Sequence, residues 1–155
     1  MHHMPDWEAL GDLAWQQAGF FTTEQGALFG FSSPLLNHHI KTGRVRRVRR
    51  GIYRLCELPR WPYGDVAVAW LWSRSVGVIS HETALALHLH RWPPPADDPR
   101  EIHLTLPPWW RTQRRLVPQN IRLHYGYVSP EESVWMDAML LTSLERTKYD
   151  LEEFG

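Results

Sequence analysis

The chain has 155 residues, 43% of them hydrophobic, with nine tryptophans and a formal net charge of zero; this composition excludes global disorder, and the length allows one medium domain or two small ones. The single cysteine, Cys56, excludes an internal disulfide and is typical of a reducing compartment. No apolar run approaches the roughly 20 residues that cross a bilayer, and residues 1–8 lack a secretory signal, so we expect a cytoplasmic protein with no membrane partner.

Two short helices are predicted at the start of the chain. Apolar residues recur at helical spacing over residues 6–18, and Gly19 should end this helix. Thr22 and Gln25 form a capping-box pattern, which predicts a second helix over Glu24–Leu28. The phenylalanines that flank this second helix are expected to fill a small core between the helices.

A third helix is predicted between Ser33 and Gly43. Ser33 is the expected N-cap and Pro34 the expected first helical residue, since a proline there loses no hydrogen bond. Gly43 ends the helix because glycine tolerates a positive φ. Leu36 and Ile40, four residues apart, share the face that meets the core. The opposite face carries three polar residues, Asn37, His38 and Lys41.

A small, very basic β-hairpin follows the third helix. Its strands are predicted over Arg44–Val48 and Ile52–Leu55, joined by a turn in which Gly51 can take the left-handed conformation. Residues 41–60 contain one acid, Glu57, and carry a net charge of +7, although the whole chain is neutral. Their eight basic residues are Lys41, Arg44, Arg46, Arg47, Arg49, Arg50, Arg54 and Arg60.

This concentration of arginine favours a nucleic-acid contact over a merely solvated basic face. The planar guanidinium group binds two phosphate oxygens at once, and a nucleic-acid backbone is the obvious polyanion. The order helix, helix, turn, helix, hairpin is that of a winged helix-turn-helix, which would occupy residues 1–58 of an α+β chain. In that fold the last helix enters the major groove, and the hairpin lies along the backbone or in the minor groove.

The expected DNA-binding residues fall into three groups, set by their positions on the third helix and the hairpin. Asparagine pairs well with adenine and lysine with guanine, and the base-edge group is Asn37, His38 and Lys41. The phosphate contacts near the ends of the helix are Ser32, Ser33 and Arg44. The wing contacts, to the backbone or the minor groove, are Arg46, Arg47, Arg49 and Arg50.

The composition changes after the stiff linker Pro59–Pro62, and a small mixed α/β domain is expected over residues 62–155. Its first predicted elements are two buried helices and two alternating strands, at residues 65–73, from Ser80 onward, at 101–106 and at 121–127. Residues 134–141 fit either a continued helix or a short strand pair that turns at Asp137. We favour the strands, followed by a helix that Ser143 caps.

Two features of the second half suggest interactions. Residues 109–115, WWRTQRR, form a second aromatic and basic cluster; it could touch nucleic acid, but we favour a hairpin loop of solvated charges. Residues 131–155 carry seven acids and two bases, a net charge of −5 opposite the basic segment. The alternative function is therefore a protein-interaction module whose acidic second domain binds a partner, with no specific DNA target.

We expect no catalytic centre, cofactor or metal. Ser80–Glu82 holds the residue types of a hydrolase triad, but neighbours at a helix start cannot face one another, so a capping serine is favoured. His81 and His88 share a helical face, and His103 and His124 could lie on paired strands. HExxH motifs and cysteine pairs are absent, however, and a zinc site needs three or four converging ligands.

Four segments look familiar in combination. The three helices followed by RVRRGIYRL are the first, and ISHETALALHLH over Ile79–His90 is the second. EIHLTLP over Glu101–Pro107 is the third. The fourth is LLTSLERTKYDL over Leu140–Leu151, with Thr142, Arg146, Thr147 and Asp150. In this order and spacing they resemble, over most of the chain, the AbiEi antitoxin family of type IV toxin–antitoxin systems.

The resemblance implies an antitoxin that is also a repressor. Members of that family bind inverted repeats in the double-stranded DNA of their own promoter through the winged helix. Their C-terminal domain is associated with countering a nucleotidyltransferase-like toxin, without a stable complex. Because this sequence stops at Gly155, just after the arginine-threonine helix, we expect a short version of that second domain.

Overall fold

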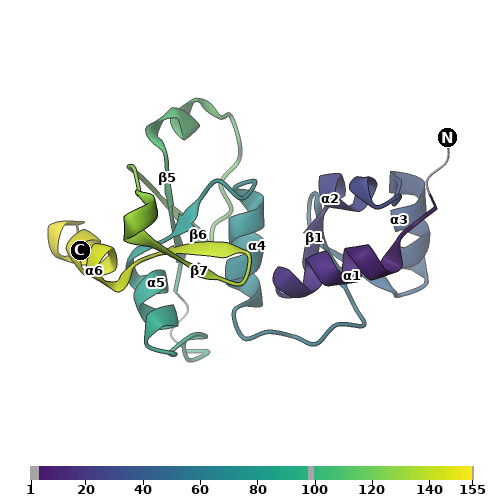
Figure 1. Cartoon of the computed structure of the whole chain (residues 1–155), viewed down its shortest axis with the longest axis horizontal. Coiled ribbons are helices and arrows are strands. Elements are labelled where there is room, and N and C mark those ends of the chain that lie inside the picture. Colours follow the sequence, from purple (N-terminus) through teal and green to yellow (C-terminus); the bar gives the residue numbers. More distant parts are fainter. Residues whose placement is uncertain (1–3, 98–99, 155) are drawn as a thin grey trace. The chain divides into compact units, whose positions relative to one another are not determined.

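The computed structural model describes residues 4–97 and 100–154. The chain divides into two compact units, residues 1–71 and 72–155, and each unit has its own sheet (Figure 1). None of the helices in the described ranges is both long and apolar enough to cross a lipid bilayer.

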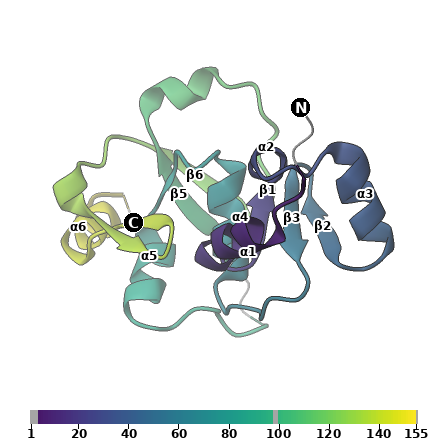
Figure 2. The same ribbon diagram turned by 45° about the vertical axis from the view of Figure 1, so that its right-hand side comes forward.

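The first unit has the element order of a winged helix. Its strands form one antiparallel sheet in the order β1-β3-β2 (Figure 2). The elements are α1 (Trp7–Gln16), β1 (Phe20–Thr22), α2 (Thr23–Leu28), α3 (Ser33–Lys41), β2 (Val45–Arg49) and β3 (Ile52–Leu55). The α+β fold class is confirmed, and β1, which pairs with β3, is a strand that the sequence analysis did not predict.

The third helix begins one residue earlier than expected. Ser32 has an extended backbone, with φ −70° and ψ 164°, and its hydroxyl accepts a hydrogen bond from the Leu35 amide at 3.3 Å. Ser32 is therefore the N-cap, and Ser33 and Pro34 are the first helical residues. The expectation that Ser33 caps the helix was wrong because both serines are good caps and only the backbone turn distinguishes them. Gly43, at φ +83°, follows the end of the helix as expected.

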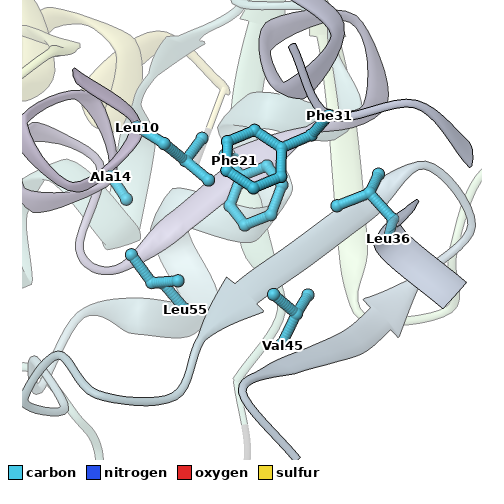
Figure 3. Close-up of a cluster of buried hydrophobic side chains, with 7 residues drawn as sticks. All are labelled: Leu10, Ala14, Phe21, Phe31, Leu36, Val45 and Leu55. Carbon is cyan, nitrogen blue, oxygen red and sulfur yellow. The ribbon is translucent and has the colours of Figure 1, made fainter. Parts of the chain in front are cut away.

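An apolar core joins the helices of the first unit to one face of its sheet (Figure 3). Its seven buried side chains, each at most 1% exposed, are Leu10, Ala14, Phe21, Phe31, Leu36, Val45 and Leu55. Burying one leucine or phenylalanine of this kind is worth about 1.5–3 kcal/mol. Because Leu36 lies in this core, the opposite side of α3 faces away from it.

Two glutamines tie the end of α1 to the start of α2. The side-chain amides of Gln17 and Gln25 exchange two hydrogen bonds of 2.9 Å. Gln25 also accepts from the Thr22 amide, which completes the expected capping box. Gln17 is 3% exposed, so its amide group depends on these protein partners for its hydrogen bonds.

Replacing Gln25 with alanine should destabilise the first unit by about 1–3 kcal/mol, because the change removes half of the capping box and leaves a buried amide partly unpaired. The free energy of unfolding in urea measures this loss. Glu24→Ala, an exposed change in the same turn, is the control and should cost less than about 1 kcal/mol. Equal losses in the two variants would contradict the role given to the Gln17–Gln25 pair.

The second unit is built on a five-stranded mixed sheet in the order β6-β5-β4-β8-β7. Along the chain α4 (Gly64–Trp72) precedes it. Its elements are β4 (Val78–Ile79), α5 (His81–His88), β5 (Ile102–Leu106), η1 (Pro108–Thr112), β6 (Ile121–Tyr125), η2 (Pro130–Glu132), β7 (Ser133–Met136), β8 (Met139–Thr142) and α6 (Leu144–Phe154). The strand pair favoured for residues 134–141 is confirmed as β7 and β8.

The segment between β5 and β6 is a crossover, and the hairpin loop expected there was wrong. The two strands run parallel, so residues 107–120 must connect opposite ends of the pair. Trp110 is 4% exposed, and the Arg115 guanidinium lies 4.7 Å from the centre of the Trp72 ring and donates to the Trp72 carbonyl. Alternating apolar residues identify a strand but not its direction, so they do not predict the crossover.

Arg146 of α6 connects three segments of the second unit. Its guanidinium donates to Asp150 Oδ1 at 2.9 Å, to Glu132 Oε2 at 3.1 Å and to the Tyr127 carbonyl at 2.8 Å. Asp150 is 3% exposed. Arg146 and Asp150, both in the segment Leu140–Leu151 noted in the sequence, are thus internal partners of each other.

Stability at low pH should depend on Glu132. Hydrogen bonds from Ser129, and then the Arg146 guanidinium, hold the pKa of Glu132 below its ordinary value of 4.5. Because the folded-state pKa is the lower one, ionised Glu132 stabilises the fold above pH 4.5, and this contribution is lost as the pH falls through the folded pKa. Glu132→Gln should therefore flatten the decline of the urea midpoint below pH 4.5. Glu131→Gln, at the exposed neighbour, is the control; parallel curves for wild type and Glu132→Gln would contradict this account.

Candidate nucleic-acid interface

The outer side of α3 is an exposed polar stripe. All three residues of the base-edge group lie on this stripe. The helical spacing places Ser33 and Pro34 on the same side of α3. The exposed residues of the stripe are Ser33, Pro34, Asn37, His38 and Lys41. The other side of the helix is buried through Leu36 or packs against the core through Leu35 and Ile40. The structure thus brings the base-edge group together on one accessible face.

The start of α3 can donate hydrogen bonds outward. The Ser32 oxygen accepts from the Leu35 amide, which leaves the hydroxyl proton of Ser32 for another acceptor. Ser33 is exposed directly beside it. The positive end of the helix dipole also lies here, so the position suits a negatively charged group.

The wing is the β2–β3 hairpin, and three of its arginines project from it. Arg46 lies opposite Arg54 and Arg47 opposite Tyr53, so Arg46 and Arg47 point to opposite faces of the hairpin. Arg50 occupies the turn, which Gly51 closes with φ +77°. Arg46, Arg47 and Arg50 are exposed, and none of them makes an ion pair with a carboxylate of the described residues.

Arg44 and Glu57 form a contact at the base of the wing. The Arg44 guanidinium lies 3.4 Å from the centre of the Trp7 ring and 3.9 Å from Glu57. The Arg44 side chain is nevertheless 43% exposed, so a phosphate can still reach it. This arrangement positions the guanidinium beside the C-terminal end of α3.

Two other arginines of the basic segment are partly or fully withdrawn from solvent. Arg54 is 7% exposed and donates to the Leu58 carbonyl at 2.7 Å, so its guanidinium group is used inside the folded unit. Arg49 is half-buried at a β-bulge opposite Ile52, and its Nε is enclosed. Of the four expected wing contacts, Arg49 is therefore the least accessible.

Trp7 and His39 pack beside the candidate interface and were not among the expected site residues. The His39 ring packs edge-on against Trp7 at 4.7 Å and lies 5.1 Å from the His38 ring. Burial lowers the pKa of His39, which favours the neutral form of its imidazole. The contacts of Trp7 with Arg44 and His39 connect α1, α3 and the base of the wing. No local sequence pattern predicts these contacts, because the three residues come together only in the folded chain.

The comparison with known families agrees with this geometry. Residues 8–55 match the model of a family described as a transcriptional regulator, AbiEi antitoxin. The match runs from α1 to the last residue of β3, which is the winged-helix fold without the second unit. A search of curated proteins finds no match to the chain. Over residues 8–55 the chain is thus similar to the AbiEi antitoxin family of transcriptional regulators, and the resemblance stated from the sequence is confirmed over this range.

Proposed function

We propose that this protein represses its own promoter by binding inverted repeats as the antitoxin of a type IV toxin–antitoxin operon. The observation that carries the proposal is the exposed polar stripe of α3 beside three arginines that have no carboxylate partner among the described residues. The match of residues 8–55 to a family of transcriptional regulators supports it. Residues 1–58 are the proposed DNA-binding domain and residues 62–155 the proposed antitoxin region.

The proposed base contacts lie on the outer side of α3. The Asn37 amide can donate to and accept from adenine, and the Lys41 ammonium can donate to guanine N7 and O6. His38 lies one residue beyond Asn37 on the same exposed stripe and is assigned to the adjacent base pair or its phosphate. These three residues would supply the sequence preference.

The proposed backbone contacts surround that helix. Ser32, Ser33 and Arg44 lie at its two ends, where phosphates pass when a helix enters the major groove. The wing contacts are Arg46, Arg47, Arg49 and Arg50. Each neutralised phosphate releases counterions, so these residues would supply affinity and salt dependence without sequence preference.

The second unit is proposed to serve the antitoxin role without catalysis. Its functional partner would be a nucleotidyltransferase-like toxin. The regulator acts inside the cell in this proposal, where its operator is.

A second candidate is a protein-interaction module that has no specific DNA target. Two exposed aromatic side chains of the second unit favour it, Tyr127 at 73% and Trp135 at 70% exposure. A gel-shift experiment at moderate salt separates the two functions. At micromolar protein concentration, the repressor shifts DNA from upstream of its own gene more strongly than a scrambled duplex, whereas the interaction module shifts neither.

The double variant Arg47→Ala/Arg50→Ala should weaken binding to all DNA sequences alike. It should also lower the slope of log K against log salt concentration by about two, because each arginine is assigned one phosphate. Fluorescence anisotropy at several salt concentrations measures the slope. Arg91→Ala/Lys148→Ala, which removes two exposed positive charges from the second unit, is the charge-matched control. A slope equal to that of the control would remove the wing from the interface.

The variant Asn37→Ala should relax the sequence preference and leave the salt slope unchanged, because a base contact neutralises no phosphate. The expected loss on the operator is about 1–3 kcal/mol, with little change on unrelated DNA. Competition binding between operator and scrambled duplexes measures it. A uniform loss on both duplexes would reassign Asn37 to the backbone.

A further inference from the structure

Three histidines that are far apart in the sequence meet in the second unit. They are His81 at the start of α5, His103 on β5 and His124 on β6. His103 Nδ1 lies 2.8 Å from His124 Nε2. The His81 ring stacks on the His124 ring with 3.6 Å between their centres. One nitrogen from each ring lies within 4.8 Å of the other two.

The parallel pairing of β5 and β6 creates this cluster. His103 is opposite Arg122 and His124 is opposite Thr105, so the two histidines lie diagonally on the same face of the sheet. His81 reaches them because the preceding residue, Ser80, donates its amide to the His103 carbonyl at 3.1 Å.

From the sequence, His81 was expected to share a helical face with His88. His88 instead bonds the Thr142 carbonyl through Nε2 at 2.8 Å, so it takes no part in the cluster. The histidine pair on the strands was also considered from the sequence, but its grouping with His81 was not.

In two of the three rings, the nitrogen that is not offered to the cluster contacts an oxygen atom of a neighbouring side chain. Glu82 Oε2 lies 3.2 Å from His103 Nε2, and Ser80 Oγ lies 2.8 Å from His81 Nδ1. When Nε2–H of His103 and Nδ1–H of His81 donate to these oxygens, the lone pairs of His103 Nδ1 and His81 Nε2 are left for a ligand. Metal-binding histidines use this arrangement, with a carboxylate or hydroxyl behind the ring.

Burial lowers the pKa of His81, His103 and His124, that of His124 to about 4. His81 is buried and has a left-handed backbone conformation, with φ +54°. Strain of this kind is found at functional sites.

We propose that His81, His103 and His124 bind one divalent transition metal ion of the zinc class. Three imidazole nitrogens are the donor set that Zn²⁺ accepts with a fourth position left open. His81 and His124 also border a cavity of about 290 Å³. A water molecule or a small anion in this cavity can occupy the fourth coordination position.

The ion replaces the hydrogen bond between two of the rings. Two nitrogens on one tetrahedral Zn²⁺ lie about 3.3 Å apart, slightly more than the 2.8 Å between His103 Nδ1 and His124 Nε2. Binding therefore separates these nitrogens by a few tenths of an ångström. It also turns the His81 and His124 rings out of their parallel stack, because each lone pair lies in the plane of its ring.

Cobalt(II) is the probe that tests the site in the full-length protein. After chelator treatment, Co²⁺ should bind the wild type with one equivalent per chain and micromolar or tighter affinity. A visible absorption band of tetrahedral type should appear, and Zn²⁺ should displace it. Failure of the wild type to bind Co²⁺ and Zn²⁺ in this range would overturn the proposal without any variant.

Two variants each remove one metal ligand with little disturbance to the fold. His124→Phe keeps an aromatic ring for the stack on His81 but has no ligand atom. His81→Asn suits the left-handed backbone, which asparagine tolerates. Each should weaken Co²⁺ binding at least about tenfold, and Glu82→Gln, behind His103, should weaken it by about tenfold or more.

The matched control is His90→Asn, because His90 is exposed and has the same left-handed backbone, with φ +55°. It should bind Co²⁺ like the wild type. Equal affinity in all variants would assign the metal to surface histidines and overturn the proposal. Zn²⁺ should also raise the Tm of the wild type and of His90→Asn but not that of His124→Phe, a readout that stays valid when a variant is less stable.

Discussion

The winged-helix unit depends on the burial of one side of α3. Leu36 is enclosed with Phe31 and Val45, so the helix cannot turn about its axis without exposing apolar surface. The polar stripe with Asn37 and Lys41 is thereby held outward. A recognition helix needs this combination, a rigid apolar attachment on one side and hydrogen-bonding side chains on the other.

The charge of the basic segment is only partly satisfied within the protein. Arg54 bonds a backbone carbonyl, and Arg44 rests on Trp7 with Glu57 nearby. Such contacts position a side chain, and an exposed pair of this kind adds little stability. Arg46, Arg47 and Arg50 have no comparable partner among the described residues. Repulsion between their positive charges destabilises the folded state, and a bound polyanion would offset that destabilisation.

The sequence predicted those features that depend on neighbouring residues. The capping box of Thr22 and Gln25, the glycine at position 43 and the alternating strands all follow from short-range rules, and the structure confirms them. The N-cap of α3 was missed by one residue, because Ser32 and Ser33 differ only in backbone conformation.

Features that depend on distant pairing were not predicted. The strand β1 has three residues and exists through its partner β3, about thirty residues later. The parallel direction of β5 and β6 determines the crossover and also brings His103 to His124. Within the interface, the support of Arg44 by Trp7 joins the start of the chain to the wing, and periodicity carries no information about it.

The most direct test of the interface is an amide chemical-shift titration of the protein with a duplex taken from upstream of its own gene. The account predicts shifts concentrated in α3 and in the wing, from Ser32 to Arg50, with the amides of α6 unchanged. Shifts confined to residues 131–154, or no shifts at protein and DNA concentrations in the micromolar range, would contradict it.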